Sequence, residues 1–496
     1  MEKKRPKQIQ WSKKTGKTSK ASEQRSNGTA ADGKTNQAKS SASPKESEKN
    51  LLQQIKEKLG KSSDVVYEQL STEKKRMNLL YIKPLCDDTK LSRSILTPFF
   101  ETGTEEEFRR ALRSLPNTSP YEDEKNAIEK LLNGHVLIEL NREHYMVDIR
   151  FTSKSVIQPT QIETVIQGPQ NAFTESIMTN IYLVRNRYHQ QGLRVELKEV
   201  GKYTKTNVAL LYDERFVDEK VLERMEEDLK NLKVDALLAA GQLETHFTRR
   251  KYSLFPTYMI TERPDRVVYN LLKGKVALLI DGTEFCLIAP AVFYDFFTSM
   301  EDEYQTFWIS HFLLLLRYLG VLITLLLPAL YVSLISYNPG FFQVQLTLAI
   351  AGSRAPVPFA SVFEVLFMIL LMEMIVEASI RLPKSISATA TTVGGLILGQ
   401  AATTAGLVSD IMIIVVSAVA ISNFVIPINT MMFAIRVIKY PIVILAAFFG
   451  TIGVVVGFFA VVFYLSNLES FGRPYFKLFI GPEAKKKEQA KPTYGI

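Results

Sequence analysis

The pattern of hydrophobic and polar residues changes at about residue 300. Upstream of this point, apolar residues come in short runs or at helical spacing, with charged residues between them. From Phe312 onward, charged residues become sparse and the apolar runs are longer than a soluble core requires. A helix that crosses a bilayer core needs about 20 apolar residues. The pattern predicts an α+β soluble N-terminal region of two small subdomains, followed by an all-α transmembrane helical bundle.

The first predicted subdomain covers residues 51–153. Helical patterns in this segment surround one strand-like run at 79–82. The apolar runs HVLIEL (135–140) and HYMVDIRF (144–151) are separated by three polar residues, which is typical of a β-hairpin. Helices are expected at 105–115 and 122–132.

The second predicted subdomain covers residues 154–298. Two apolar runs at 276–280 and 285–288 flank an Asp-Gly-Thr turn, which predicts a hairpin next to the membrane. The same triplet occurs in aspartic proteases, but a tight turn explains it more simply. The other elements expected here are a helix near 176–190, strands near 193–200 and 208–212, and a helix at 218–232.

The predicted transmembrane domain covers residues 299–470 and holds four to six segments. Residues 341–351 are too few to cross a bilayer, so this segment is expected to be re-entrant or interfacial. Residues 471–496 are expected to form a C-terminal tail. The predicted spans are 312–337, 359–380, 393–408, 411–427 and 442–466.

The net charge of +9 lies mainly in the first 50 residues, which hold 13 Lys and Arg against 5 Asp and Glu. This segment has almost no large apolar residues, so we expect a disordered basic tail at 1–50. A solubilising tether is the simplest role for it; contact with anionic membrane lipid is the alternative, and no nucleic-acid partner is expected. Arg381 with Lys384, and Arg436 with Lys439, would face the cytoplasm if the soluble half is cytoplasmic, as the positive-inside rule prefers.

Residues that could carry catalysis are not grouped in recognisable motifs. The five histidines show no metal-ligand spacing, and no serine lies in a nucleophile-elbow pattern. Two cysteines, Cys86 and Cys286, do not make a disulfide framework or a metal site, and are expected to be small buried side chains. We therefore expect no enzyme activity, no cofactor and no metal.

Three glutamates lie in the second predicted span. An ionised carboxylate near the middle of a bilayer is costly unless it faces protein or water. At 100° per residue, Glu373 and Glu377 share a helix face and Glu364 lies nearly opposite. One interpretation is a cation path or gating element, with Glu373 the deepest. The alternative is structural: Glu377 pairs with Arg381 one turn away, and Glu364 caps a helix or reaches the membrane surface.

Small and polar residues mark the third and last predicted spans. Spacing of small residues by four allows helix backbones to approach closely, within or between subunits. Gln400 and Thr403 add polar character to the third span, where they could line water or bond to a neighbouring helix. The pairs expected in helix packing are Gly395 with Gly399, Ala402 with Gly406, and Gly453 with Gly457.

Several motifs resemble the A subunits of GerA-type spore germinant receptors. The first is Thr261-Glu262-Arg263-Pro264-Asp265, and the resemblance extends over about residues 79 to 480. Around the second span the chain departs from the family pattern; for example, Arg354-Ala355-Pro356 stands where relatives often have Arg-Glu-Gly. The further motifs are LLKGKVALLIDGT (271–283), LLRYLG (315–320), LPALYVSLIS (327–336), GSRAPVPF (352–359), IRLPKSI (380–386) and GGLILGQAA (394–402).

The resemblance implies a multi-pass subunit of a nutrient sensor in the spore inner membrane. Its expected partners are a transporter-like B subunit and a lipoprotein C subunit. Copies of the A subunit are expected to oligomerise into a ligand-gated ion channel that releases cations and triggers germination. Two other functions remain open: a secondary transporter, although no internal repeat is visible, and a non-conducting membrane scaffold that relays binding.

Overall fold

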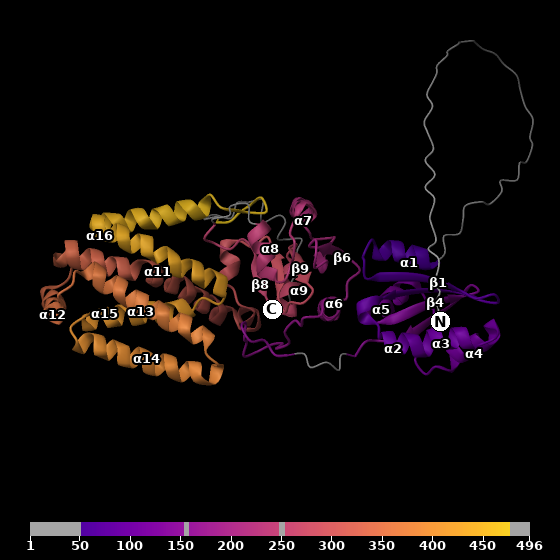
Figure 1. The fold of residues 1–496 in the computed structure, drawn as a ribbon. Coiled ribbons are helices and arrows are strands. Elements are labelled where there is room, and N and C mark those ends of the chain that lie inside the picture. The colour runs from indigo at the N-terminus through magenta and orange to yellow at the C-terminus, as the bar shows by residue number, and fades with distance from the viewer. Residues whose placement is uncertain (1–50, 153–157, 248–252, 477–496) are drawn as a thin grey trace, which may run out of the picture. The chain divides into compact units, whose positions relative to one another are not determined.

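The computed structural model describes residues 51–152, 158–247 and 253–476. The tail predicted at residues 1–50 and most of the tail predicted at 471–496 lie outside the described residues. Along the chain, two five-stranded antiparallel sheets precede a series of long helices (Figure 1). The predicted fold class, an α+β region followed by a helical region, is confirmed.

The first sheet has the strand order β1-β2-β4-β5-β3, and each neighbouring pair is antiparallel. The predicted hairpin is confirmed, with Val136 paired to Val147. The helices expected at 105–115 and 122–132 are confirmed as α4 and α5, and the strand-like run at 79–82 lies in β2. The expectation that this run is the single strand before the hairpin was wrong, because β1 pairs with β2, for example Tyr67 with Leu80, and its polar residues hide the alternation. The strands are β1 Val65–Ser71, β2 Arg76–Ile82, β3 Thr118–Pro120, β4 His135–Leu140 and β5 Glu143–Asp148.

Helices cover both faces of the first sheet. One face packs on α3 and α4 through Phe99 and Phe108, and the other packs on α1 and α5 through Ile55 and Leu131. Helix α4 begins at a capping box in which Thr104 and Glu107 satisfy each other's backbone N–H groups. The helices are α1 Leu51–Leu59, α2 Asp88–Leu91, α3 Thr97–Glu101, α4 Glu105–Ser114 and α5 Glu124–Leu132.

The second sheet has the strand order β6-β7-β9-β10-β8 and is also antiparallel. Helices α6 and α9 pack on one face, and α7 and α8 on the other. The predicted hairpin before the membrane is confirmed as β9 and β10. The elements are α6 Ile177–Arg185, β6 Leu193–Val200, β7 Thr206–Asp213, α7 Glu219–Asn231, α8 Ala240–Phe247, β8 Met259–Thr261, α9 Pro264–Leu272, β9 Val276–Ile280 and β10 Cys286–Ala289.

The helical region reverses direction repeatedly. The Tyr331 hydroxyl lies 3.0 Å from Ser409 Oγ, while Gly320, three turns earlier in α11, lies against Ser422, so α11 and α15 are antiparallel. Helix α13 begins beside the end of α11, where Ser336 Oγ is 2.5 Å from Ser361 Oγ. The helices are α10 Met300–Tyr304, α11 Phe307–Tyr337, α12 Val344–Arg354, α13 Ser361–Arg381, α14 Lys384–Thr404, α15 Asp410–Phe424 and α16 Asn429–Ser466, followed by the short strands β11 Glu469–Ser470 and β12 Arg473–Pro474.

Helix α16 breaks at Gly450, whose φ of 61° and ψ of −138° are not helical. A Cβ at Gly453 would lie 2.1 Å from the Leu445 carbonyl oxygen, so the chain folds back on itself at this point. The Tyr337 hydroxyl donates a hydrogen bond to the Ala447 carbonyl, at 2.5 Å. Figure 1 shows the two halves of α16 as separate coils that diverge from this turn. The prediction of one last span at 442–466 was therefore wrong.

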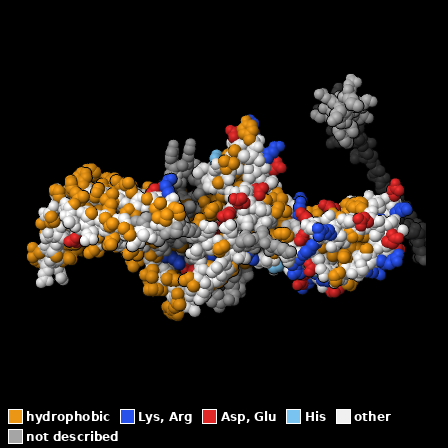
Figure 2. All heavy atoms as spheres, turned by 60° about the horizontal axis from the view of Figure 1, so that its bottom comes forward, with side chains coloured by type: hydrophobic (Ala, Val, Ile, Leu, Met, Phe, Trp, Pro, Cys, Tyr) orange, Lys and Arg blue, Asp and Glu red, His pale blue; other side chains and the backbone are white. Residues whose placement is uncertain are grey.

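The surface of the helical region is mainly apolar. In Figure 2 hydrophobic side chains cover most of its visible face, whereas charged side chains are frequent over the sheets. Exposed apolar patches of this extent mark surfaces that contact lipid or protein. By length and composition, two of the described helical segments could cross a membrane: Phe307–Tyr337, and Asn429–Ser466 when its two halves are taken together. Their 18-residue apolar windows have mean hydropathies of 2.2 and 2.6. A domain of four to six segments stays a prediction.

Candidate functional site

Glu373 of α13 lies between two basic side chains of α16. One carboxylate oxygen accepts a hydrogen bond from Lys439 Nζ at 2.8 Å. The other accepts from Arg436 Nε at 2.8 Å and also from Arg436 Nη2. The Lys439 side chain is fully buried, that of Arg436 is 10% exposed, and that of Glu373 is half-buried. Arg436 and Lys439 fall between the predicted spans 411–427 and 442–466, but in the structure α16 already begins at Asn429 and both side chains are buried. Their expected cytoplasmic side stays a prediction.

This ion cluster (Glu373, Arg436 and Lys439) carries one negative and two positive formal charges. Removing one partner of a buried ion pair typically costs about 3–5 kcal/mol, because the remaining charge stays buried without compensation. The cluster therefore links α13 firmly to the first half of α16. Its net positive charge repels a passing cation, so Glu373 in this arrangement does not offer a free carboxylate to one.

Glu364 lies nine residues before Glu373 on α13, on nearly the opposite face of the helix. Its side chain is buried against the start of α15. Its Oε1 accepts hydrogen bonds from the Ser409 backbone N–H at 2.6 Å and the Ser409 hydroxyl at 2.5 Å. Its Oε2 accepts one from the Tyr331 hydroxyl at 3.2 Å and lies 3.5 Å from Arg354 Nε. The N-terminus of a helix carries a partial positive charge that favours a carboxylate. Glu364 thus joins α11, α13 and α15 at one end of the helical region.

Glu377 lies on the exposed surface of α13. Its carboxylate accepts hydrogen bonds from Arg381 Nη2 at 2.6 Å and Nε at 3.1 Å, one helical turn away. Both side chains are more than half exposed. Glu373 and Glu377 share a face of α13 but bind different partners, and neither shares a partner with Glu364. The three glutamates therefore occupy three separate environments.

Helix α14 makes few contacts within the chain. Ala402 is buried, and the other residues from 386 to 404 with a described side-chain environment are exposed or half-buried. Among the described residues, and apart from the backbone of α14 itself, a Cβ at Gly395 would meet nothing within 4 Å and one at Gly399 would meet only the tip of Ile413. The Thr403 hydroxyl donates to the Gln400 carbonyl of its own helix at 3.0 Å.

The other glycines expected in helix packing lie at the end of α14 and in the second half of α16. Gly406 ends α14 with φ of +67°, and a Cβ there would lie 3.0 Å from the Pro356 carbonyl oxygen. Gly453 and Gly457 face the first half of α16, where a Cβ at Gly457 would lie 3.3 Å from Ile442 and Leu445. These two glycines let the two halves of α16 approach each other closely.

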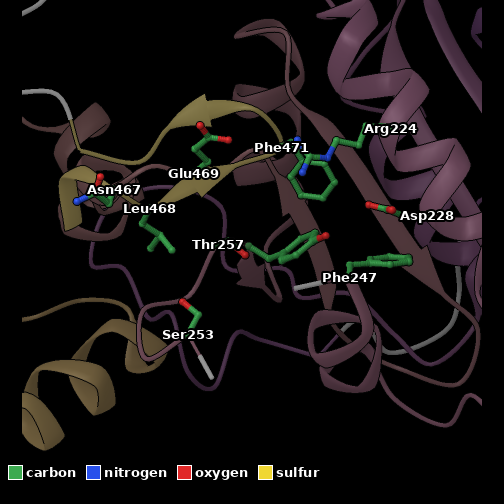
Figure 3. A pocket seen from close by; sticks show the side chains of 10 residues that line it. Arg224, Asp228, Phe247, Ser253, Thr257, Asn467, Leu468, Glu469 and Phe471 are labelled. Carbon is green, nitrogen blue, oxygen red and sulfur yellow. The ribbon is translucent and has the colours of Figure 1, made fainter. Parts of the chain in front are cut away.

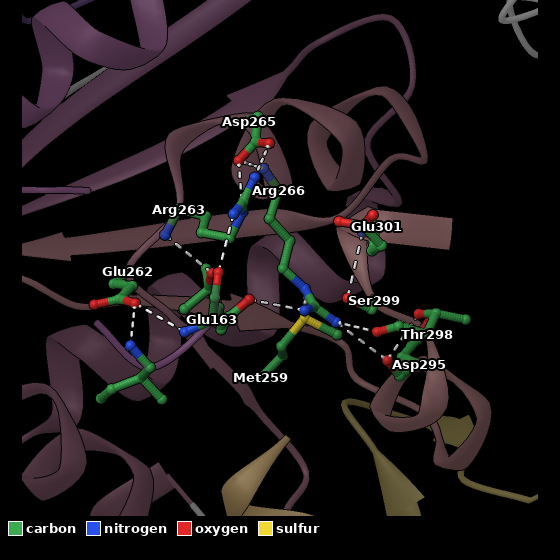
Figure 4. A network of polar contacts seen from close by, with 12 residues as sticks. Glu163, Met259, Glu262, Arg263, Asp265, Arg266, Asp295, Thr298, Ser299 and Glu301 are labelled. Atoms are coloured by element: carbon green, nitrogen blue, oxygen red, sulfur yellow. Dashed lines mark hydrogen bonds and ion pairs between the residues drawn. The ribbon is translucent and has the colours of Figure 1, made fainter. Parts of the chain in front are cut away.

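A polar network lies where the second sheet meets α10 (Figure 4). Its residues belong to the motifs of the family resemblance and were not expected to form a site. Arg263 is paired with Asp265 at 2.6 Å, and Arg266 with Glu163 at 2.8 Å. Both arginine side chains are almost completely buried. The signal in the sequence was the alternation of charges in Glu262-Arg263-Pro264-Asp265-Arg266 between apolar runs.

Burial also shifts the pKa values of groups close to this network. It lowers the pKa of Lys275, although Asp295 at 2.8 Å opposes the shift. Burial, together with the carboxylate of Asp265, raises the pKa of Tyr304 to about 12. The Tyr304 hydroxyl accordingly stays protonated and donates to Asp265 at 2.9 Å.

A pocket opens between α7, α8 and the hairpin of β11 and β12 (Figure 3). The guanidinium of Arg224 lies 6.0 Å from the ring centre of Phe471 at its wall. Asp228 and Glu469 add negative charge to the lining, opposite in sign to that of Arg224. Among the described residues, no group of three or more His, Cys, Asp or Glu side chains is placed to hold a metal ion.

The chain is similar over most of its length to known spore germination proteins. The family model described as Bacillus/Clostridium GerA spore germination protein matches residues 53–491. Spore germination protein KA of Bacillus subtilis (strain 168) is 34% identical over 438 residues, which are 86% of this chain and 80% of that protein. Spore germination protein GerLA of Bacillus cereus is 36% identical over 340 residues, or 68% of this chain and 69% of that protein.

One similar solved structure is the N-terminal domain of the A subunit of the Bacillus megaterium spore germinant receptor GerK3. It is 29% identical, covers 49% of this chain and 94% of that chain, and superposes with a TM-score of 0.38. The family match over residues 53–491 confirms the resemblance inferred from the sequence motifs. The chain therefore belongs to the GerA family of spore germination proteins.

Proposed function

We propose that this chain is the A-type membrane subunit of a nutrient-sensing germinant receptor and that several copies assemble into a nutrient-gated cation channel. The receptor would lie in the spore inner membrane, beside a transporter-like B subunit and a lipoprotein C subunit. Opening of the channel would release cations and start germination. The exposure of α14 is the observation that carries this proposal.

Helix α14 combines small residues, polar residues and little contact with its own chain. Gln400 is exposed and Thr403 half-buried, on a helix whose other described residues are mostly apolar or small. Exposed amide and hydroxyl groups are unfavourable against lipid tails, so polar residues in membrane helices usually face protein or water. A second copy of the chain packed along Gly395 and Gly399 would cover one side of α14. Thr403, one turn after Gly399, would lie at the border of this contact, and Gln400, about 100° further round the helix from Gly399, would face a central axis.

The ion cluster of Glu373 fits a gating role better than a cation path. Its net positive charge makes the interior of a single chain unfavourable for cations, which supports a pore between copies instead. Because the cluster joins α13 to α16, and α13 leads directly into α14, breaking it would free the segment that carries the pore-lining residues. Glu364 and Glu377 are assigned an anchoring role and a surface role in this scheme.

The direction of the helices supports six crossings with a cytoplasmic soluble half. Helices α11, α13, α14 and α15 and the two halves of α16 run alternately away from and back toward the sheets. An even number of crossings leaves the C-terminus on the side of the soluble half. In this arrangement Arg381, at the end of α13, would lie on the cytoplasmic side, as the positive-inside rule prefers.

Single-channel recording of the purified chain in planar bilayers, with and without the B and C subunits, tests the channel. We expect cation conductance that depends on nutrient and B subunit, and an oligomeric particle in detergent. The variant Gly395→Leu should remain folded and become monomeric and non-conducting. Absence of conductance in every assembled form would leave the scaffold function, and nutrient uptake coupled to an ion gradient would favour a transporter.

A further inference from the structure

Residues 158–173, which we call the strap, form a loop that closes on itself. The Thr160 backbone N–H donates to the Gln170 carbonyl at 2.8 Å, and the Ala172 N–H donates to the Gln158 carbonyl at 2.9 Å. The segment that these bonds close, between Thr160 and Gln170, extends from the second sheet to α10. Its tip is open to the surroundings, and Ile166 is 89% exposed.

One half of the strap is held by the second sheet and the start of α9. The Glu262 carboxylate accepts hydrogen bonds from the Ile162 and Glu163 backbone N–H groups, at 2.6 and 2.9 Å. Arg263 donates to the Glu163 and Pro169 carbonyls, each at 2.9 Å. Figure 4 shows Glu262, Arg263 and Arg266 converging on this side of the strap.

The other half is held by α10, the short helix that precedes α11. The Glu301 carboxylate accepts hydrogen bonds from the Ile166 N–H at 2.8 Å and the Gln167 N–H at 3.4 Å. Gly168, with φ of +117°, lies against the ring of Tyr304, where a Cβ would be only 2.5 Å from the ring. The strap therefore fits α10 closely, through a carboxylate and a glycine contact.

The residue after Glu301 connects α10 to the first long membrane helix. Asp302 accepts hydrogen bonds from Arg317 Nη2 at 2.9 Å and from Arg317 Nη1. Arg317 Nη1 also donates to the Phe297 carbonyl at 2.9 Å. Arg317 lies in α11 and is almost fully buried. Two neighbouring carboxylates on one short helix thus bind the strap on one side and α11 on the other.

We propose that the strap is a coupling element that transmits conformational change between the soluble region and α11 through Glu301, Asp302 and Arg317. The amides of Ile162, Glu163, Ile166 and Gln167 are held by side-chain carboxylates rather than by a strand ladder. The strap can therefore detach while both sheets stay intact, which is the local opening that a switch requires. The coupling is a property of the folded chain and holds whether or not the chain conducts ions.

Hydrogen exchange of the purified full-length chain in detergent tests the coupling, because energetic linkage between two sites is reciprocal. Glu301→Ala should accelerate exchange of peptides covering residues 162–167 at least tenfold. Arg317→Lys keeps the charge but loses the paired bonds to Asp302, and it should accelerate the same strap peptides at least threefold although Arg317 does not touch the strap. Glu303→Ala is the matched control on α10, because Glu303 bonds to Tyr269 of α9.

Strap exchange within a factor of 1.5 of the wild type in Arg317→Lys, with Glu301→Ala accelerated, would overturn the coupling and leave a static anchor. The same holds if Glu303→Ala accelerates the strap as much as Glu301→Ala. Exchange in the β4–β5 hairpin reports global unfolding. If it rises in Arg317→Lys, then Asp302→Asn takes its place, and an unchanged strap in that variant overturns the proposal equally.

Discussion

The carboxylate of Glu364 binds both the backbone N–H and the hydroxyl of Ser409, so a side chain of α13 holds the first turn of α15. Ser409 itself accepts the Met412 N–H at 3.3 Å as the N-cap of α15. Between them, the two residues satisfy N–H groups that the start of a helix leaves without intrahelical partners. This contact makes Glu364 part of the scaffold on which the other helices depend.

Replacing Glu364 with alanine is expected to destabilise the helical region by about 3 kcal/mol. The change leaves a cavity and removes the carboxylate that accepts from two buried donors of Ser409. A hydrogen bond to a charged group typically contributes about 1.5–3 kcal/mol to stability. The midpoint of thermal unfolding in detergent measures the effect. Glu377→Ala on the same helix is the control and should change stability by less than about 0.5 kcal/mol, because its ion pair is exposed. Equal losses in both variants would contradict the anchoring role.

Glu373→Gln is expected to alter ion flux or germination, because it leaves the buried Lys439 and Arg436 without their counter-charge. Removing one member of such a cluster typically costs about 3–5 kcal/mol. The double variant Glu373→Gln/Lys439→Met removes one charge of each sign and should recover part of the stability. Folded yield and germination rate are measured together. A Glu373→Gln receptor that assembles and germinates like the wild type would remove the gating assignment.

Alanine at Gly453 and at Gly395 should have opposite outcomes. At Gly453 the new methyl would lie 2.1 Å from the backbone carbonyl of Leu445, which cannot move without opening the turn of α16. At Gly395 a new methyl would meet no described residue within 4 Å outside the helix's own backbone, and alanine favours the helix by up to about 1 kcal/mol. Membrane yield and size-exclusion profile should be poor for Gly453→Ala and normal for Gly395→Ala. A normal profile for Gly453→Ala would contradict the reversal at Gly450.

The two cysteines should be unreactive in the folded chain. Burial raises the pKa of the Cys86 thiol to about 12, and it also raises the pKa of Cys286 above its usual range. Because the thiolate is the reactive form, iodoacetamide at pH 8 should label neither residue in mild detergent. Both should be labelled after denaturation in SDS, as mass spectrometry can show. Labelling of either cysteine in the native chain would contradict the burial of its strand or loop.

Periodicity in the sequence was sufficient to predict most elements of the soluble half. In the β4–β5 and β9–β10 hairpins, the strands are apolar runs or alternate between apolar and polar residues, and turn residues separate them. Both patterns are local signals. Strand β1 was missed because Glu68, Gln69 and Ser71 give an edge strand a polar composition. Its identity depends on pairing with β2, which no local pattern records.

The family, the division into a soluble and a helical region, and the presence of carboxylates within apolar helices could all be inferred from the sequence alone. Only the tertiary structure decided which charges meet: Glu373 with Arg436 and Lys439, 63 and 66 residues away, and Glu364 with Ser409, 45 residues away. A buried charge must be compensated, but the compensating group can come from any helix that packs nearby. A hydropathy profile therefore shows that a charge within an apolar helix is unfavourable, but the packing of the helices determines which group compensates it.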